Sequence, residues 1–253
     1  EYLCTKFKDK IGINDQNIYG YTALMLAAQY NVNECVIKYL CDTFKDKLDP
    51  KKHNINGLTA FMLAAQNKNV KIIQCLYETF KDTIDINSQD TCGYTAFMIA
   101  AEHNTNVEML QYLCDKFKDT IDINQQDQGG RNALMLAARF NPNEAVMQYL
   151  CDAFKDVVDI KKQNNNGFNV FMLAAHNENE KVMEYLCATF KDTIDINQQN
   201  RIGDSALMLA VHNTNDKVLQ CLCNSFKDTI DINQQNNDGY TALMLAAWFN
   251  TND

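Results

Sequence analysis

The chain has 253 residues, 46% of them hydrophobic, with nine glycines and two prolines, a composition typical of a folded and mostly helical protein. Its 23 basic and 32 acidic residues give a formal net charge of −9, which repels nucleic-acid phosphates and anionic lipid surfaces, so we expect neither as a partner. No apolar run approaches the roughly 20 residues of a spanning helix, and no basic-then-apolar leader opens the sequence, so we expect a soluble segment without membrane insertion.

The first residues already belong to a repeated pattern. The phrase EYLCTKFKD at residues 1–9 returns as EYLCATFKD at residues 184–192. At the other end, the last residues follow a phrase that elsewhere continues into a second helix. We therefore expect that both ends are cuts through a longer array.

One phrase recurs seven times, from GYTALMLAA at Gly20 to GYTALMLAA at Gly239. Its glycines, 36 or 37 residues apart, are Gly20, Gly57, Gly93, Gly130, Gly167, Gly203 and Gly239. Such a period is typical of stacked supersecondary units, each completed by its neighbours. We predict one solenoid domain over residues 1–253, with partial repeats at 1–19 and 239–253 and six whole repeats at 20–56, 57–92, 93–129, 130–166, 167–202 and 203–238.

Each repeat is predicted to contain two helices. Two positions after the glycine stands a short polar side chain that can accept from the first free N–H groups of a helix: Thr22, Thr59, Thr95, Asn132, Asn169, Ser205 and Thr241. Residues such as Leu24, Met25 and Ala28 then form the apolar face of a short first helix. A second amphipathic helix follows, with apolar positions three and four apart. Its predicted caps are Asn33, Asn69, Asn106, Asn143, Asn179 and Asn215.

The phrase DINQQDQGGRNALMLAA at residues 122–138 resembles the turn and first helix of the ankyrin repeat family, where an Asp-x-x-Gly turn leads into Thr-Pro-Leu-His and a small-residue pair. The resemblance recurs over essentially the whole chain. It implies an all-α solenoid of ankyrin-like helix-turn-helix repeats with β-hairpin-like loops, which binds a protein or peptide.

Two departures from the family pattern lead to further expectations. Alanine or valine and methionine, as in Ala23 and Met25, replace the family's proline and histidine, so we expect apolar packing instead of the histidine's polar contact. The repeats also exceed the family's length of about 33 residues, mainly through the phrase FKDTID. We expect this phrase to lengthen the second helix by about one turn.

Ten cysteines raise the question of disulfides or a metal. Six of them share one column at the repeat period, which indicates core positions: Cys4, Cys41, Cys114, Cys151, Cys187 and Cys223. Equivalent residues of adjacent repeats lie roughly 8–10 Å apart, beyond the reach of a disulfide. Reduced thiols and a cytoplasmic location are therefore expected. Zinc at Cys221, Cys223 and His212 is the alternative, but packing is favoured because four convergent ligands are not visible.

No constellation of residues indicates catalysis. The chain has four histidines, no Gly-rich phosphate loop and no His-Glu-x-x-His phrase. The recurring FKD phrase, which includes Phe7 and Phe226, is interpreted as stacking between second helices, with a repeated docking signal as the alternative. We predict that the segment is not an enzyme and holds no catalytic, cofactor or metal site.

Partner-binding residues are expected where the repeats differ, because constant columns are committed to stacking. The variable columns are the two residues before each glycine, the one after it, and the two after the small-residue pair. All three arginines and the one tryptophan fall there, and these residue types dominate interface hot spots; for a single aromatic residue the alternative is β-propensity in the loop. The predicted partner-binding residues are Tyr19, Tyr21, Tyr30, Leu58, Tyr94, His103, Arg131, Arg139, Phe140, Phe168, His176, Arg201, Asp204, His212, Tyr240, Trp248 and Phe249.

We therefore predict a scaffold or adaptor that binds a protein partner through the concave face of hairpins and first helices. The net charge favours basic over acidic partner surfaces. One alternative is a structural spacer or self-assembly module within a larger cytosolic protein. Burial of the arginine and aromatic residues would favour this alternative. Another is the regulatory region of an enzyme, channel or effector outside this segment. The oligomeric state stays open.

Overall fold

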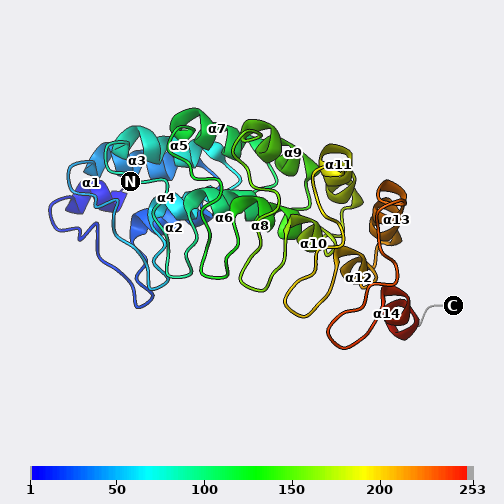
Figure 1. The fold of residues 1–253 in the computed structure, drawn as a ribbon. Helices are drawn as coiled ribbons and strands as arrows, with labels where there is room; N and C mark the ends of the chain where they lie inside the picture. The colour runs from blue at the N-terminus through cyan, green and yellow to red at the C-terminus, as the bar shows by residue number, and fades with distance from the viewer. Residues whose placement is uncertain (1, 250–253) are drawn as a thin grey trace. The chain divides into compact units, whose positions relative to one another are not determined.

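A computed structural model describes residues 2–249, which form fourteen α-helices and no strands (Figure 1). The helices belong to two compact units, one ending at Asp122 and the other beginning at Ile123. Each unit is an α-solenoid of helix-turn-helix repeats, which confirms the predicted fold class. The single domain over 1–253 and its repeat boundaries stay predictions, and residues 1 and 250–253 lie outside the described part. We number the repeats from the glycines, so that repeat 1 begins at Gly20 and repeat 4 at Gly130.

In unit 1 the first helices of successive repeats stand side by side in one layer and the second helices in another (Figure 1). The helices of this unit are α1 (Tyr2–Phe7), α2 (Ala23–Tyr30), α3 (Glu34–Phe44), α4 (Ala60–Ala65), α5 (Val70–Phe80), α6 (Ala96–His103) and α7 (Val107–Phe117). Here α4 contacts α2 and α6 in the first layer, and α5 contacts α3 and α7 in the second.

Unit 2 repeats this arrangement. Its helices are α8 (Ala133–Phe140), α9 (Glu144–Ala153), α10 (Val170–Ala174), α11 (Glu180–Phe190), α12 (Ala206–Ala210), α13 (Asp216–Ser225) and α14 (Ala242–Phe249). The first helices α8, α10, α12 and α14 contact one another in sequence, and α11 contacts both α9 and α13.

Side-chain caps start nearly all of these helices. The predicted cap of the first helix accepts from the N–H three residues later, as Asn132 does from Met135 at 2.9 Å, in every described repeat except repeat 6. There Ser205 makes no such bond, so its predicted capping role is wrong. All six predicted asparagine caps of the second helices accept from the N–H two residues later.

The phrase FKDTID does not extend the second helix, contrary to the prediction. The helix ends at its phenylalanine or one residue before it, and the following residues form a separate closed turn. In repeat 1 the Phe44 carbonyl accepts from Lys47 N at 2.8 Å and Leu48 N at 2.9 Å. These two bonds satisfy the Phe44 carbonyl and close the turn without a C-terminal glycine.

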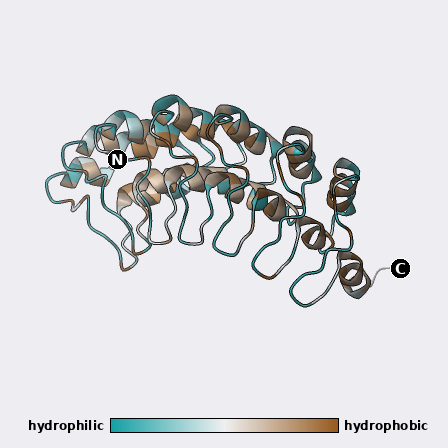
Figure 2. Ribbon diagram, viewed as in Figure 1, coloured by the Kyte–Doolittle hydropathy of each residue, from teal (hydrophilic) through white to brown (hydrophobic). Residues whose placement is uncertain are grey.

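The core of each unit lies between its two layers, and hydrophobic residues concentrate on the helices while the loops are hydrophilic (Figure 2). The methionines at the family's histidine position are buried in six repeats, which confirms the expected apolar packing: Met25, Met62, Met98, Met135, Met172 and Met208. The small pair that follows, such as Ala137 and Ala138, is also buried, which lets neighbouring helices approach closely.

The loop before each first helix forms a finger closed by a tight turn. In the finger that leads into repeat 4, the Asp127 carbonyl accepts from Gly130 N, and the Asp127 side chain accepts from Arg131 N. Gly130 has φ of 77°, and a Cβ there would stand 2.6 Å from Asn165 N of the next finger, so glycine is required. Each finger is also closed like a hairpin by a backbone bond across four residues, such as Asp127 N to Arg131 O at 2.9 Å. Two fingers add an isolated bridge, His53–Thr59 and Gln199–Ser205.

A ladder of buried asparagines joins successive repeats within each unit. Asn67 donates to the carbonyls of Ala28 at 3.0 Å and Asn31 at 2.9 Å in the preceding repeat, while its oxygen accepts from Asn69 N. Asn177 does the same toward Ala138 and Asn141. Because these amides satisfy carbonyls at the end of the preceding first helix, the ladder fixes how one repeat stacks on the next.

The cysteine and phenylalanine columns mostly occupy the core. Within the cysteine column, Cys41, Cys114, Cys151 and Cys187 are buried, whereas Cys4 and Cys223 are half-buried. All ten cysteines of the described chain are free thiols. Phe226 is buried in the core, where its ring meets Phe171 of the preceding repeat with centroids 6.0 Å apart. Phe171 lies on the first helix α10, so this contact is not the expected one between second helices. Within residues 2–249, no helix combines the length and apolarity needed to cross a bilayer.

Candidate functional site

All seventeen predicted partner-binding residues reach the surface at least in part, and none is buried. Eight are exposed, among them Tyr30, Phe140 and Trp248. The others, such as Arg139 and Phe168, are half-buried. Exposure of these positions is the feature that distinguishes a binding surface from a spacer whose variable residues serve stacking.

Five of these residues line one hollow of about 330 Å³ in unit 2, which we name the repeat 4–5 groove. It lies between two fingers and the C-terminal ends of the first helices of repeats 4 and 5. Its walls are Gly129, Arg131, Met135, Arg139, Phe140, Asn164, Asn166, Phe168, Leu173 and His176. No acidic residue of the described chain lines it, although the chain as a whole is acidic.

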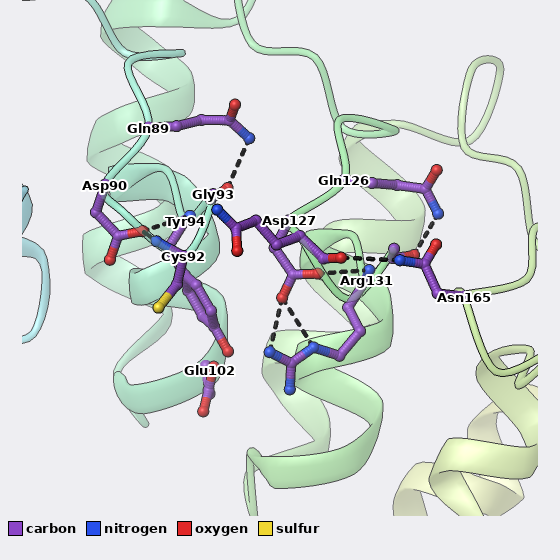
Figure 3. Close-up of polar contacts among 12 residues, drawn as sticks. Gln89, Asp90, Cys92, Gly93, Tyr94, Glu102, Gln126, Asp127, Arg131 and Asn165 are labelled. Carbon is purple, nitrogen blue, oxygen red and sulfur yellow. Dashed lines mark hydrogen bonds and ion pairs between the residues drawn. The ribbon is translucent and has the colours of Figure 1, made fainter. Parts of the chain in front are cut away.

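Arg131, at the finger side of the groove, is committed to its own turn. Its Nε and Nη2 lie 2.8 and 2.7 Å from Oδ2 of Asp127, whose side chain is fully buried (Figure 3). The other carboxylate oxygen accepts from Arg131 N at 2.8 Å. The charge of Arg131 is therefore neutralised within the finger, and its main role is to brace the turn.

Arg139, at the end of α8, is not neutralised in this way. Its Nη1 is buried and donates no hydrogen bond to any residue of the described chain. The guanidinium carbon lies 5.6 Å from the centre of the Phe140 ring, a cation–π distance. Partial burial lowers the pKa of Arg139, but an arginine stays charged at neutral pH. The groove thus holds a partly desolvated cation with an unused donor.

His176, just after α10, is neutral at pH 7. Burial, followed by the positive charge of Arg139 and by His212, lowers the pKa of His176 to about 4. A neutral imidazole offers one donor and one acceptor without adding charge. With Phe140 and Phe168 alongside, the groove combines one cation, aromatic surface and directional polar groups.

The remaining predicted residues lie outside this groove. Trp248 and Phe249 stack at 5.1 Å on α14, where Phe249 meets His212 at 4.4 Å and Trp248 meets Tyr240 at 5.5 Å. At the fingers, Asp204 accepts from Asn236 at 2.9 Å, and Arg201 is exposed. The rest lie in unit 1 and line neither the hollow around Pro50 nor the one around Cys75: Tyr19, Tyr21, Tyr30, Leu58, Tyr94 and His103.

The repeat lengths carry a signal for the groove that the sequence reasoning missed. The spacing from each ladder asparagine to the next glycine is always 26 residues. The spacing from a glycine to the ladder asparagine that follows it varies: it is 11 residues in repeats 1, 3 and 4, and 10 residues in repeats 2, 5 and 6. The extra residue therefore lies at the end of the first helix, as Tyr30, His103 and Phe140, all exposed. In repeat 4 this extra residue forms a wall of the groove.

A second hollow, of about 420 Å³, lies in unit 1 at a position the sequence did not suggest. Pro50 and Lys51 line this hollow. In the other repeats the position of Pro50 holds an isoleucine, mostly followed by asparagine, and this isoleucine is buried at Ile86, Ile123, Ile160 and Ile196. Proline is smaller than the isoleucine that stands there in the other repeats. None of the predicted binding residues lines it.

No group of three or more His, Cys, Asp or Glu side chains in residues 2–249 is arranged to hold a metal. This includes Cys221, Cys223 and His212, for which zinc was the alternative. Cys221 lies 4.0 Å from the Ser225 oxygen on its own helix.

Comparison with known proteins agrees with the repeat architecture. A family model described as ankyrin repeats (3 copies) matches residues 1–90, 46–127, 76–159, 118–200 and 189–253. The fold is also similar to the crystal structure of the ankyrin repeat domain of Bcl-3, described there as a unique member of the IkappaB protein family. That match has a TM-score of 0.62 and 21% identity, over 87% of this chain and 90% of that one. No curated protein matches the chain in sequence.

Proposed function

The chain belongs to the ankyrin repeat family, generally a protein–protein interaction module, and from this premise we propose that it is a scaffold or adaptor that binds a protein partner through the repeat 4–5 groove. The observation that carries the proposal is the convergence of five variable residues on one hollow: Arg131, Arg139, Phe140, Phe168 and His176. The partner, a folded domain or an extended peptide, then binds the face formed by the fingers and the first helices.

The composition of the groove supports this role. Arginine and aromatic side chains concentrate binding energy because they offer large contact areas and directed hydrogen bonds. Phe140 keeps 47% of its surface exposed at the end of α8, where the shorter repeats lack a corresponding residue. A passive spacer would have no need of this exposed phenylalanine.

Catalysis is not part of the proposal. Ankyrin repeat folds are typically non-enzymatic binding modules, and the groove lacks a nucleophile paired with a base. Nucleic acid is disfavoured as a partner by the net charge of −9. A cytoplasmic location is proposed from the ten free thiols, and alkylation in fresh lysate should find them reduced.

The experiment compares retention of partners from lysate of the native cells by three forms of the chain. The groove variant carries Arg139→Ala, Phe140→Ala and Phe168→Ala. The matched variant carries Gln29→Ala, Tyr30→Ala and Leu58→Ala, the corresponding positions of repeats 1 and 2. We expect a protein retained by the parent and the matched variant and lost by the groove variant.

Circular dichroism and urea unfolding first show that all three forms are folded. Equal retention by the groove variant would contradict the proposed site. Loss only in the matched variant would move the site to repeats 1 and 2, and no retained protein for any form would favour the spacer.

A further inference from the structure

We propose that the repeat 4–5 groove takes an acidic segment of its partner, with a carboxylate on the Arg139 guanidinium and an apolar side chain between Phe140 and Phe168. The inference rests on the proposed function, since it names the chemistry of what the same groove binds.

The first step is the incomplete bonding of Arg139. A buried guanidinium nitrogen without an acceptor loses the hydrogen bonds that water would give it, and the Phe140 ring offsets this only in part. A carboxylate that enters the groove offers charge-assisted hydrogen bonds to the half-buried guanidinium, a pairing that arginine favours. No acidic side chain lines the groove within the described chain, so a ligand is the available source.

The second step is the charge of the groove. Arg131 is neutralised by Asp127, and His176 is neutral at pH 7 with its pKa lowered to about 4. Arg139 alone therefore leaves one net positive charge at the walls. One positive charge matches a single carboxylate and does not balance a phosphate dianion.

The third step is the apolar part of the ligand. Phe140 and Phe168 line the groove together with Met135 and Leu173. A hollow of about 330 Å³ is at the small end of ligand sites, which suits a few side chains of a peptide rather than a folded surface. An acidic residue next to an aliphatic or aromatic one supplies both groups.

This conclusion runs against the chain's overall charge, which favours basic partners. Exposed charges farther than about 8 Å are largely screened at physiological ionic strength, whereas a partly buried charge in the contact itself is not. The local charge of the groove therefore decides the chemistry of what lies in it, and the acidic outer surface acts on other parts of the partner.

The test uses the whole chain and a phage-displayed library of random twelve-residue peptides. The parent should enrich peptides with Asp or Glu beside an apolar residue. The best peptide is then synthesised with its acidic residue and with the matching amide, and both forms are titrated calorimetrically against the parent and Arg139→Gln. We expect the amide form to bind the parent roughly tenfold or more weakly, and both forms to bind Arg139→Gln equally.

The outcomes separate this inference from the proposed function. If binding is lost in Phe140→Ala with Phe168→Ala but acid and amide forms bind alike, the acidic preference is wrong and the groove remains the site. The same holds if the acid–amide difference persists in Arg139→Gln. If no enriched peptide depends on Phe140 and Phe168, the proposed function fails as well.

Discussion

Repeats 1 and 2 in unit 1 and repeats 4 and 5 in unit 2 are built alike but carry different chemistry. In both pairs a long repeat precedes a short one, so an extra residue ends the first helix, Tyr30 in one pair and Phe140 in the other. In both pairs a buried asparagine of the short repeat, Asn67 or Asn177, holds the end of that helix.

The two pairs of repeats differ in the residues at their variable positions. Repeats 1 and 2 hold uncharged residues at the corresponding places: Tyr21, Gln29, Tyr30, Leu58 and Gln66. The amide of Gln29 donates to Gln66 at 3.4 Å, so polar groups there partly satisfy each other. In repeats 4 and 5 the corresponding residues are the charged Arg139 and the hydrogen-bonding ring of His176, which do not pair. The same scaffold therefore presents an uncharged, partly paired surface in one pair of repeats and a charged one in the other.

The largest effect on stability is expected when the ladder asparagine that the two pairs share is replaced. Asn67→Ala and Asn177→Ala should each lower the free energy of unfolding by about 2–4 kcal/mol, because buried carbonyls lose their donor. Urea unfolding measures this, with the exposed Asn224→Ala as control, expected within about 0.5 kcal/mol of the parent. A small loss at both ladder positions would mean that the amides do not hold the stack.

The second prediction concerns a residue that differs between the pairs. Since folding lowers the pKa of His176 from 6.5 to about 4, the unfolded chain binds more protons between these values, and stability falls as pH falls through that window. His176→Gln, which introduces the residue found at Gln66, should remove this dependence. From pH 7 to pH 5 the parent should lose on the order of 1 kcal/mol more than the variant, allowing for partial exposure.

Urea unfolding of both chains at the two pH values tests this. Equal losses would show that His176 titrates near its ordinary pKa and that the groove can carry a second positive charge in mildly acidic solution.

The smallest effect on stability concerns an asparagine contact between neighbouring repeats, named the clamp, which is absent within both pairs. In other fingers an asparagine such as Asn124 donates to the next repeat, in this case to Val157 O at 2.7 Å, and accepts from Asp159 N at 3.0 Å. Lys51 and Lys161 stand at this position in repeats 1 and 4. Lys51→Asn and Lys161→Asn should each raise the free energy of unfolding by roughly 0.5–1.5 kcal/mol. Chemical denaturation checks this, and no gain at either site would show that the clamp is energetically neutral.

The sequence predicts much of this architecture because the determinants are local. The glycine of each finger, the caps such as Asn33 and the buried methionines depend on neighbours within a few residues. Ser205 fails as a cap, although the same position accepts a bond in the other described repeats. The FKDTID phrase forms a turn rather than more helix, because Phe44 O is satisfied by the residues that follow it.

What the sequence did not predict depends on partners a whole repeat away. The ladder amide of Asn177 meets carbonyls 36 and 39 residues earlier, and local spacing gives no sign of such a contact. The pairing of Arg131 with Asp127 was within reach, since the two lie four residues apart, but the carboxylate was interpreted only as part of a turn. Of the seventeen predicted binding residues, the structure gathers five in one groove, and binding by any of them stays a prediction.

The most direct test of the groove as the binding site is photo-crosslinking in the native cells, with a benzoyl-phenylalanine in place of Phe140 or, in a separate chain, of Tyr30. Both positions end a first helix and both are exposed, at 47% and 67%. We expect a discrete crosslinked protein from position 140 that is absent when Arg139→Gln is added, and none from position 30. Equal products from both positions, or a product from position 30 alone, would contradict binding at the groove.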